Sequence, residues 1–408
     1  MSDRLCPRCG EPLAAHAAEH PNCARRRLPG LARWRREPLL LIAVIAITAG
    51  LWAITYFLTH AYAARQDHLA REWFQRGQDR LKSNRLDQAV KAFQTAIVYS
   101  PDDFAYRLHL AQALIADQQF RQAETYLQAL WEEEPDNGRV NLELARLAAA
   151  RGVFAIAVRY YHGAVYGFWN HDPAARRRQA HLELVQYLLQ HKAMPQAESE
   201  LIALAAELPR DPAWMVRVGD LFQTAGVYDR ALLEYSNALA LDPRNPAALA
   251  GAGQAAFQLG RYEEARQYLR RALAVNPRDQ QSAGLLRTAD LVLQLDPFAH
   301  RLGADERSRR VLRDLQQAQD RLESCAKDRG MAIDVTPPQT RLQSDYAQLL
   351  ALRRRLSVAA LRRQPELVDT AMDLVFRAER DAVQPCGAAT GPDHALLLLA
   401  RRRQGEAP

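Results

Sequence analysis

A repeat of 34 residues runs through the middle of this 408-residue chain and constrains its fold more than any other feature. Six copies fit the period, at 70–103, 104–137, 138–171, 178–211, 212–245 and 246–279. Within a copy, small residues recur at positions 8, 20 and 27, large apolar residues at 17 and 24, and proline near 32. In the first copy these positions hold Gly77, Ala89, Ala96, Leu86, Phe93 and Pro101. Small residues let two antiparallel helices approach closely and proline ends the second helix, so each copy predicts one helix pair.

The pattern resembles the tetratricopeptide repeat, whose signature places W-x2-L-G-x2-Y in the first helix and A-x3-F, then P, in the second. Trp73 and Gly77 occupy the first set of positions, and Ala231 and Tyr235 occupy the second set in the fifth copy. The resemblance covers 70–279 and implies an all-α fold in which about six repeats stack into a right-handed solenoid. The last apolar face of a solenoid must be covered, so we expect a capping helix within 280–297.

The resemblance also implies a concave groove that is lined by the first helices and binds a protein segment. The side chains expected to face it lie at and beside positions 5, 9 and 12: Phe74, Gln78, Leu81, Leu108, Gln112, Leu142, Arg146, Val216, Arg217, Asp220, Gln223, Gln254 and Phe257. This mixture of polar and apolar side chains suits a peptide more than a phosphate ligand. The set of Lys, Asn and Arg by which chaperone-binding relatives hold a C-terminal carboxylate is missing.

Six extra residues interrupt the period between the third and fourth copies, in the stretch Phe168–Pro173. Tyr160, Tyr161 and Tyr166 come just before it. One hypothesis is an aromatic contact patch for a partner. The other, which we favour, is an extended helix whose aromatic side chains fill a widened joint.

Residues 38–59 contain no charged side chain. As a helix rising about 1.5 Å per residue, they would extend roughly 33 Å and match the hydrocarbon core of a bilayer. A buried core helix seldom runs this long without a charge. A cleaved signal peptide is the other alternative, since Ala61–Ala63 resembles a cleavage site, but signal h-regions measure about 7–15 residues. We expect a retained transmembrane helix.

Arginines near its two ends predict the orientation of this helix. Six precede it within twenty residues, and only Arg65, Arg71 and Arg76 follow it within the same distance. The asymmetry places the N-terminus in the cytoplasm. In a bacterium, the repeats and the C-terminal region would then lie in the periplasm, anchored to the inner membrane by a single pass.

The N-terminal residues 1–30 carry cysteines at metal-binding spacing. Cys6-Pro-Arg-Cys9-Gly10 resembles a zinc knuckle, and His20 and Cys23 form a second pair after ten residues. The arrangement resembles a small zinc ribbon with one structural Zn held by Cys6, Cys9, His20 and Cys23, although His16 could replace His20. His16–His20 also spells the H-x-x-E-H string of a metalloprotease motif, but no protein-sized domain surrounds it.

Apolar residues at helical spacing predict further helices in the C-terminal region, 298–408. It contains the remaining cysteines, Cys325 and Cys386. On the outer side of a membrane an even pair favours a disulfide over two isolated buried thiols.

The charge and motif content exclude other classes of function. The net charge is +7, but residues 1–37 hold eight arginines against four acidic residues, so no basic stripe for nucleic acid remains. No glycine-rich phosphate loop or nucleophile–base pair occurs, and we expect neither enzymatic activity nor a small-molecule substrate.

The sequence therefore favours a membrane-anchored scaffold or adaptor that binds protein partners on the periplasmic side of the bacterial inner membrane, in envelope assembly. A regulatory adaptor with inverted topology, its repeats in the cytoplasm, is the alternative. A periplasmic enzyme is the third and least favoured hypothesis.

Overall fold

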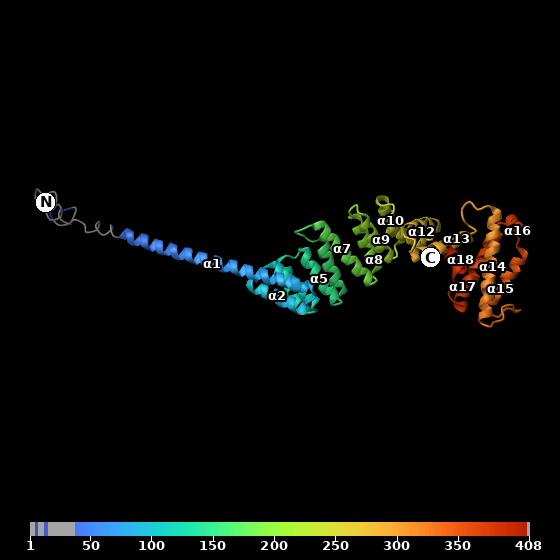
Figure 1. Ribbon diagram of the computed structural model, residues 1–408, viewed down its shortest axis with the longest axis horizontal. Helices are drawn as coiled ribbons and strands as arrows, with labels where there is room; N and C mark the ends of the chain where they lie inside the picture. Colours follow the sequence, from blue (N-terminus) through green and yellow to red (C-terminus); the bar gives the residue numbers. More distant parts are fainter. Residues whose placement is uncertain (1–4, 7–11, 15–36, 406–408) are drawn as a thin grey trace. The chain divides into compact units, whose positions relative to one another are not determined.

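The computed structural model describes residues 5–6, 12–14 and 37–405, and within them every regular element is a helix (Figure 1). The chain forms two compact units. The N-terminal unit comprises Met1–Pro135 and Arg146–Val153, and the C-terminal unit comprises Asp136–Ala145 and Phe154–Pro408. The helix α5 (Gly138–Ala150) therefore contributes one part to each unit.

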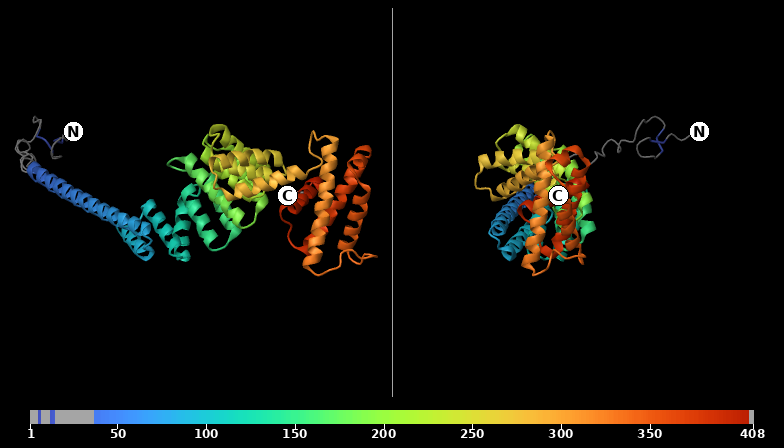
Figure 2. Two further views of the ribbon diagram at one scale, coloured as in Figure 1. Left: turned by 45° about the vertical axis from the view of Figure 1, so that its right-hand side comes forward. Right: turned by 90° about the vertical axis from the view of Figure 1, so that its right-hand side faces the viewer.

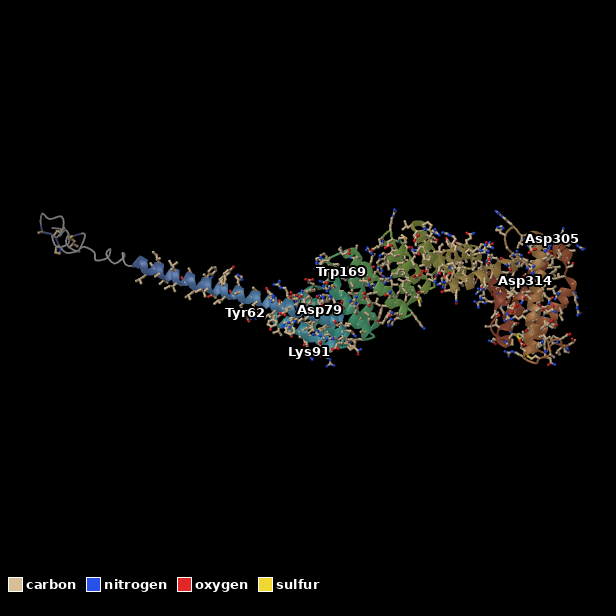
Figure 3. The ribbon with its side chains drawn as sticks, viewed as in Figure 1. Tyr62, Asp79, Lys91, Trp169, Asp305 and Asp314 are labelled. Atoms are coloured by element: carbon tan, nitrogen blue, oxygen red, sulfur yellow. A yellow bond between two sulfur atoms is a disulfide. The ribbon has the colours of Figure 1, made fainter. Side chains whose placement is uncertain are left out.

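The first helix, α1 (Glu37–Lys82), is 46 residues long and joins the apolar stretch to the first repeat without a break. The intervening residues include the good helix formers Ala61, Ala63 and Ala64 and contain neither glycine nor proline. Its portion Leu40–Lys82 is the one helix in the described chain that is long and apolar enough to cross a membrane. From Leu40 to Tyr62 its apolar side chains are exposed and project from a part of the helix that no other described element covers (Figure 3).

The other helices of the N-terminal unit are α2 (Leu86–Tyr99), α3 (Phe104–Ala116) and α4 (Phe120–Glu133). Gly77 of α1 shows why the repeat pattern calls for a small residue: a Cβ there would lie 2.6 Å from the ring of Phe93 on α2. Asp103 begins α3 by accepting a hydrogen bond from the backbone N–H of Tyr106.

The C-terminal unit continues the helix pairs. Its repeat helices are α6 (Phe154–Tyr166), α7 (Pro173–Gln190), α8 (Met194–Ala206), α9 (Pro212–Thr224), α10 (Tyr228–Leu241), α11 (Pro246–Gln258) and α12 (Tyr262–Val275). Proline stands at the first position of α7, α9 and α11, where its missing N–H costs nothing. The preceding Asp172, Asp211 and Asn245 accept hydrogen bonds from the first turns of these helices.

Five helices follow α13 (Gln280–Leu295): α14 (Ala304–Asp328), α15 (Arg341–Arg355), α16 (Val358–Arg363), α17 (Glu366–Cys386) and α18 (Gly391–Gln404). Figure 2 shows α14, α15 and α17, in orange and red, side by side. The expected capping helix is α13, and α18 returns from the end of the chain to pack against it. One continuous set of buried apolar residues runs from Leu182 to Ala400. The region 298–408 therefore shares its core with the last repeats instead of forming a separate domain.

Candidate functional site

Several predicted groove residues are part of the packing between helices. Phe74 on α1 lies within an aromatic cluster, where its ring centroid is 4.7 Å from that of Tyr106 and 4.8 Å from that of His109. It remains half-buried, as do its neighbours Gln78 and Leu81 on α1. These three side chains still offer some surface to a partner.

Three other predicted groove residues offer almost none. Leu108 is 0% exposed, and Leu142 and Phe257 are 6% exposed each. Phe257 packs edge-on against Tyr262, with 5.3 Å between the ring centroids. The expectation that these three side chains contact a partner is therefore wrong for this structure. Position within a helix shows which side a residue faces, but the neighbouring helices cover that side here.

The remaining predicted residues keep accessible surface. Arg217 and Asp220 are exposed, and Gln112, Arg146, Val216, Gln223 and Gln254 are half-buried. Asp220 already has a structural role, because its Oδ1 accepts a hydrogen bond from the hydroxyl of Tyr235 at 2.6 Å. Burial and this bond to a carboxylate both raise the pKa of Tyr235, so its hydroxyl stays protonated. Gln254 accepts a hydrogen bond from Gln281 on α13.

Arg217 belongs to a basic and aromatic cluster that only the structure reveals. The guanidinium carbon of Arg217 lies 5.6 Å from the ring centroid of Trp214, and that of Arg178 on α7 lies 5.8 Å from it. The Nε atom of Arg178 is buried without a hydrogen-bond partner. Trp214 and Arg217 are three residues apart on one helix, a spacing that predicts their contact. No local pattern predicts that Arg178 joins them.

A polar cluster around the buried His181 links α6, α7 and α8. Glu200 Oε1 lies 3.0 Å from His162 Nε2, and Glu200 Oε2 lies 2.8 Å from His181 Nε2. The hydrogen bond from the His181 ring lowers the pKa of Glu200 the most, and the bond from His162 lowers it further. Burial opposes this shift, but the pKa stays below its usual value. Across residues 5–6, 12–14 and 37–405, no group of three or more His, Cys, Asp and Glu could hold a metal ion.

The joint between α6 and α7 agrees in part with the favoured hypothesis of an extended helix. The helix α7 is extended: it has 18 residues, whereas α9 and α11 have 13 each, and it begins at Pro173, before the fourth copy starts at residue 178. Trp169 is buried in the joint (Figure 3), as the favoured interpretation requires of an aromatic residue. Tyr166 and Phe168 are exposed.

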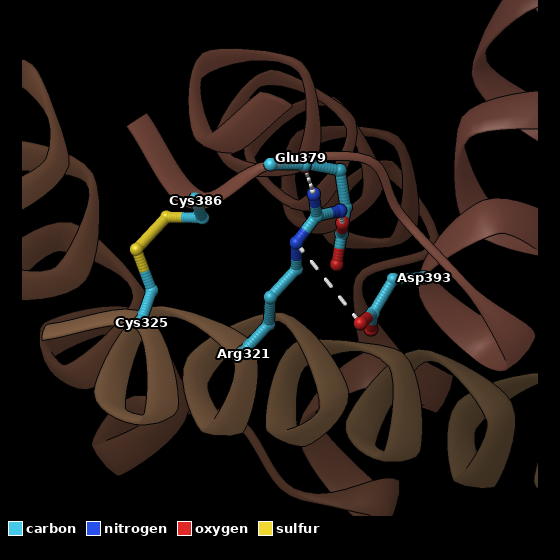
Figure 4. Close-up of a disulfide and its surroundings, with 6 residues drawn as sticks. Arg321, Cys325, Glu379, Cys386 and Asp393 are labelled. Atoms are coloured by element: carbon cyan, nitrogen blue, oxygen red, sulfur yellow. Dashed lines mark hydrogen bonds and ion pairs between the residues drawn. A yellow bond between two sulfur atoms is a disulfide. The ribbon is translucent and has the colours of Figure 1, made fainter. Parts of the chain in front are cut away.

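In the C-terminal helices, the structure joins the two cysteines that the sequence pairs. The disulfide Cys325–Cys386 ties α14 to the end of α17, with 5.3 Å between the Cα atoms (Figure 4). One turn away, the buried Arg321 donates a hydrogen bond to the buried carboxylate of Glu379. Burial raises the pKa of Glu379 to about 7, although Arg321 opposes the shift.

The predicted zinc ligands are only partly described. Cys6 is buried, and its neighbour Leu5 forms an antiparallel bridge with Pro12. Cys9, His20 and Cys23, and the alternative ligand His16, lie outside the described residues.

Two stretches, 80–147 and 224–288, match the family model for the tetratricopeptide repeat. Both stretches consist of the helix pairs described above, so the chain is a tetratricopeptide repeat protein with additional C-terminal helices. No curated protein sequence matches the chain.

Among solved structures, the chain is similar to YrrB, described as a TPR protein with an unusual peptide-binding site: 17% identity over 48% of this chain and 97% of that one, TM-score 0.37. It is similar to Pseudomonas aeruginosa pilF, with 16% identity over 53% of this chain and 96% of that one, TM-score 0.37. It is also similar to PilW, a widely conserved type IV pilus biogenesis factor, with 17% identity over 53% and 98% of the two chains and TM-score 0.37.

Proposed function

We propose that this protein is a non-enzymatic scaffold that binds a segment of a partner protein along the first helices of its repeats. The observation that carries the proposal is the accessible cluster on α9 and α7, where Arg217 and Arg178 flank Trp214. Neither guanidinium forms an ion pair with any described residue, and Trp214 is packed on the core. A rigid aromatic side chain beside two unpaired arginines is typical of an anchor site for a peptide.

We further propose that α1 anchors the scaffold in a membrane. Leu40, Trp52 and Phe57 are all exposed on this helix, as are the apolar side chains between them. Burying such a surface in a bilayer removes the cost of exposing it to water. The arginine asymmetry at its ends favours a cytoplasmic N-terminus and periplasmic repeats on the bacterial inner membrane.

The pairing of Cys325 with Cys386 supports the same orientation, because disulfides persist in the periplasm and are rare in the cytoplasm. Envelope assembly is the process that such a protein would serve. The inverted topology, with the repeats as a cytoplasmic regulatory adaptor, would expose this disulfide to reducing conditions.

For the N-terminal residues we propose one structural zinc ion, held by Cys6, Cys9, His20 and Cys23. The support is the ligand spacing, since two thiolates two residues apart can hold one metal ion. Zinc analysis of the purified full chain tests the proposal: about one zinc per chain is expected. Its loss in a Cys9→Ser variant would identify the site, and a wild-type chain without zinc would contradict the proposal.

The groove is tested by photocrosslinking in intact cells. A photoreactive residue in place of Arg217 should crosslink to a discrete partner, and one in place of Arg244 should not. Arg244 serves as the matched control because it is exposed on the same unit, between α10 and α11. The crosslink from position 217 should disappear when Trp214 is changed to Ser. Equal crosslinking from both positions would contradict the proposal.

A further inference from the structure

Several hydrogen bonds fix the backbone of the joint between α6 and α7. The backbone N–H of Phe168 donates to the carbonyl of Asp136 at 2.7 Å, and the N–H of Gly138 donates to the carbonyl of Phe168 at 2.8 Å. Trp169 is 8% exposed, and its Nε1 donates to the carbonyl of Ala164 at 2.9 Å. A side chain on Gly138 would overlap the Trp169 indole. Glycine is therefore required for this close approach.

Two aromatic side chains project from this fixed backbone into solvent. Tyr166 is 71% exposed and Phe168 is 64% exposed. Among the large apolar side chains described in the C-terminal unit, these two are the most exposed. Because the backbone is already ordered, burying the rings against a partner would cost little conformational entropy. Exposed rings on a rigid support are typical of binding hot spots.

Two arginines lie near these rings. Arg177 Nη2 donates to the carbonyl of Gly167 between the two rings, at 3.3 Å. Arg176 is exposed and forms no ion pair with a described residue. Burial lowers the pKa of Arg139, and the positive charge of Arg176 lowers it further, whereas the negative charge of Glu143 raises it. The N-terminal end of α7, at Pro173, adds the positive end of a helix dipole.

We propose that Tyr166, Phe168, Arg176 and Arg177 form a second docking surface, for an acidic protein segment that carries an exposed apolar side chain. We call these four residues the joint surface. The apolar side chain would pack between the two rings, and the acidic residues of the segment would pair with the arginines. This surface lies around the connection between α6 and α7 and contains none of the proposed groove residues, so it extends the partner contacts beyond that groove.

A protein segment fits the joint surface better than an anionic bilayer does. Asp172, at the start of α7, and Asp136, paired through its backbone with Phe168, are both exposed. A bilayer rich in anionic lipid would bring headgroup charges against both carboxylates. A peptide can place its acidic residues against the arginines alone.

The test uses the full chain in phosphatidylcholine nanodiscs and a panel of labelled peptides. Each peptide has one Trp, Phe or Leu flanked by Asp and Glu, and each has a partner with Lys and Arg instead. The wild-type chain should bind at least one acidic peptide with a Kd below about 1 mM and none of the basic ones. Tyr166→Ser with Phe168→Ser should weaken that binding about tenfold or more. Arg176→Gln with Arg177→Gln should weaken it and reduce its salt dependence.

The matched control is Leu233→Ser with Leu241→Ser, which removes two exposed apolar side chains of the same unit and should leave binding unchanged. Arg217→Glu separates the two proposals: loss of binding in this variant would assign the peptide to the proposed groove, and unchanged binding would assign it to the joint surface. The joint surface is disproved if no acidic peptide binds, or if the aromatic double variant binds as well as wild type. It is also disproved if only vesicles containing phosphatidylserine bind and the double variant abolishes that binding.

Discussion

Asp314 on α14 is a buried carboxylate without a compensating partner. It is fully buried, and neither of its oxygens has a hydrogen bond in the structure. Burial raises the pKa of Asp314 well above its usual value, although Arg313 and Arg310 oppose the shift. When folding raises the pKa of a carboxyl group, the folded state is less stable with that group ionised than with it protonated. The free energy of unfolding should therefore fall as the pH rises from the unfolded pKa through the folded one.

We predict that Asp314→Asn stabilises the protein by about 1–3 kcal/mol at pH 8, because it removes the cost of a buried charge. The gain should shrink at pH 4, where the wild-type carboxyl is protonated in the fold. Thermal unfolding of the full chain in detergent at both pH values measures the difference. Asp305→Asn, an exposed position on the same helix, is the control. A gain for Asp314→Asn that does not change with pH would contradict the argument.

Two glycines test the packing of the repeats at the same scale. A side chain on Gly251 of α11 would overlap the ring of Tyr235, which comes from α10. Gly284 of α13 has open space beside it. We predict that Gly251→Ala lowers the stability by about 1–3 kcal/mol through overpacking. Gly284→Ala should instead raise it by up to about 1 kcal/mol, since alanine is the better helix former. Urea unfolding of both variants compares them, and equal effects would contradict the packing argument.

At the scale of elements, the disulfide and its neighbours hold the C-terminal helices together. Cys325–Cys386 closes a segment of 61 residues that contains α15, α16 and most of α17. Arg321, next to the disulfide, pairs with Glu379 and lies 4.0 Å from a carboxylate oxygen of Asp393 on α18 (Figure 4). Covalent and ionic links thus join α14, α17 and α18 at one place.

We predict that Cys325→Ser with Cys386→Ser destabilises these helices by roughly 2–4 kcal/mol, because the open chain gains conformational entropy on unfolding. Hydrogen exchange should become faster in α14, α15 and α17 and stay unchanged in α2 and α3 of the N-terminal unit. A reductant should have the same effect on the wild type and none on the double variant. Uniform exchange rates in all three samples would show that the disulfide contributes nothing to stability.

At the scale of the whole molecule, the proposed membrane anchor can be tested together with the side of the membrane on which the repeats would lie. A membrane-impermeant maleimide distinguishes the two topologies in intact spheroplasts. We predict that an Arg244→Cys variant is labelled at once. The wild type should be labelled only after permeabilisation, because the proposed topology places Cys6, Cys9 and Cys23 inside and Cys325 is paired with Cys386. Labelling of the wild type in intact spheroplasts would instead establish the inverted topology.

The sequence by itself determined the helical repeat class and the positions of most helix pairs, although α1 and α7 begin before the copies to which they belong. Both are local properties: small residues mark where two helices touch, and proline and glycine mark where helices end. The cysteine pair followed from counting, and the apolar stretch from its length. Residues 60–69 contain neither glycine nor proline, so the sequence could also have predicted that α1 continues from the apolar stretch into the first repeat.

Only the tertiary structure decided which side chains are accessible. Leu108 and Arg217 were both predicted to face the groove, yet one is buried and the other exposed. The structure also makes contacts that no sequence period predicts. Arg178 lies beside Trp214, Trp169 packs against Gly138, and Asp314 is buried. Helical periodicity assigns a residue to one side of its own helix. Its burial depends on side chains that other helices bring to that side, and these come from distant parts of the chain.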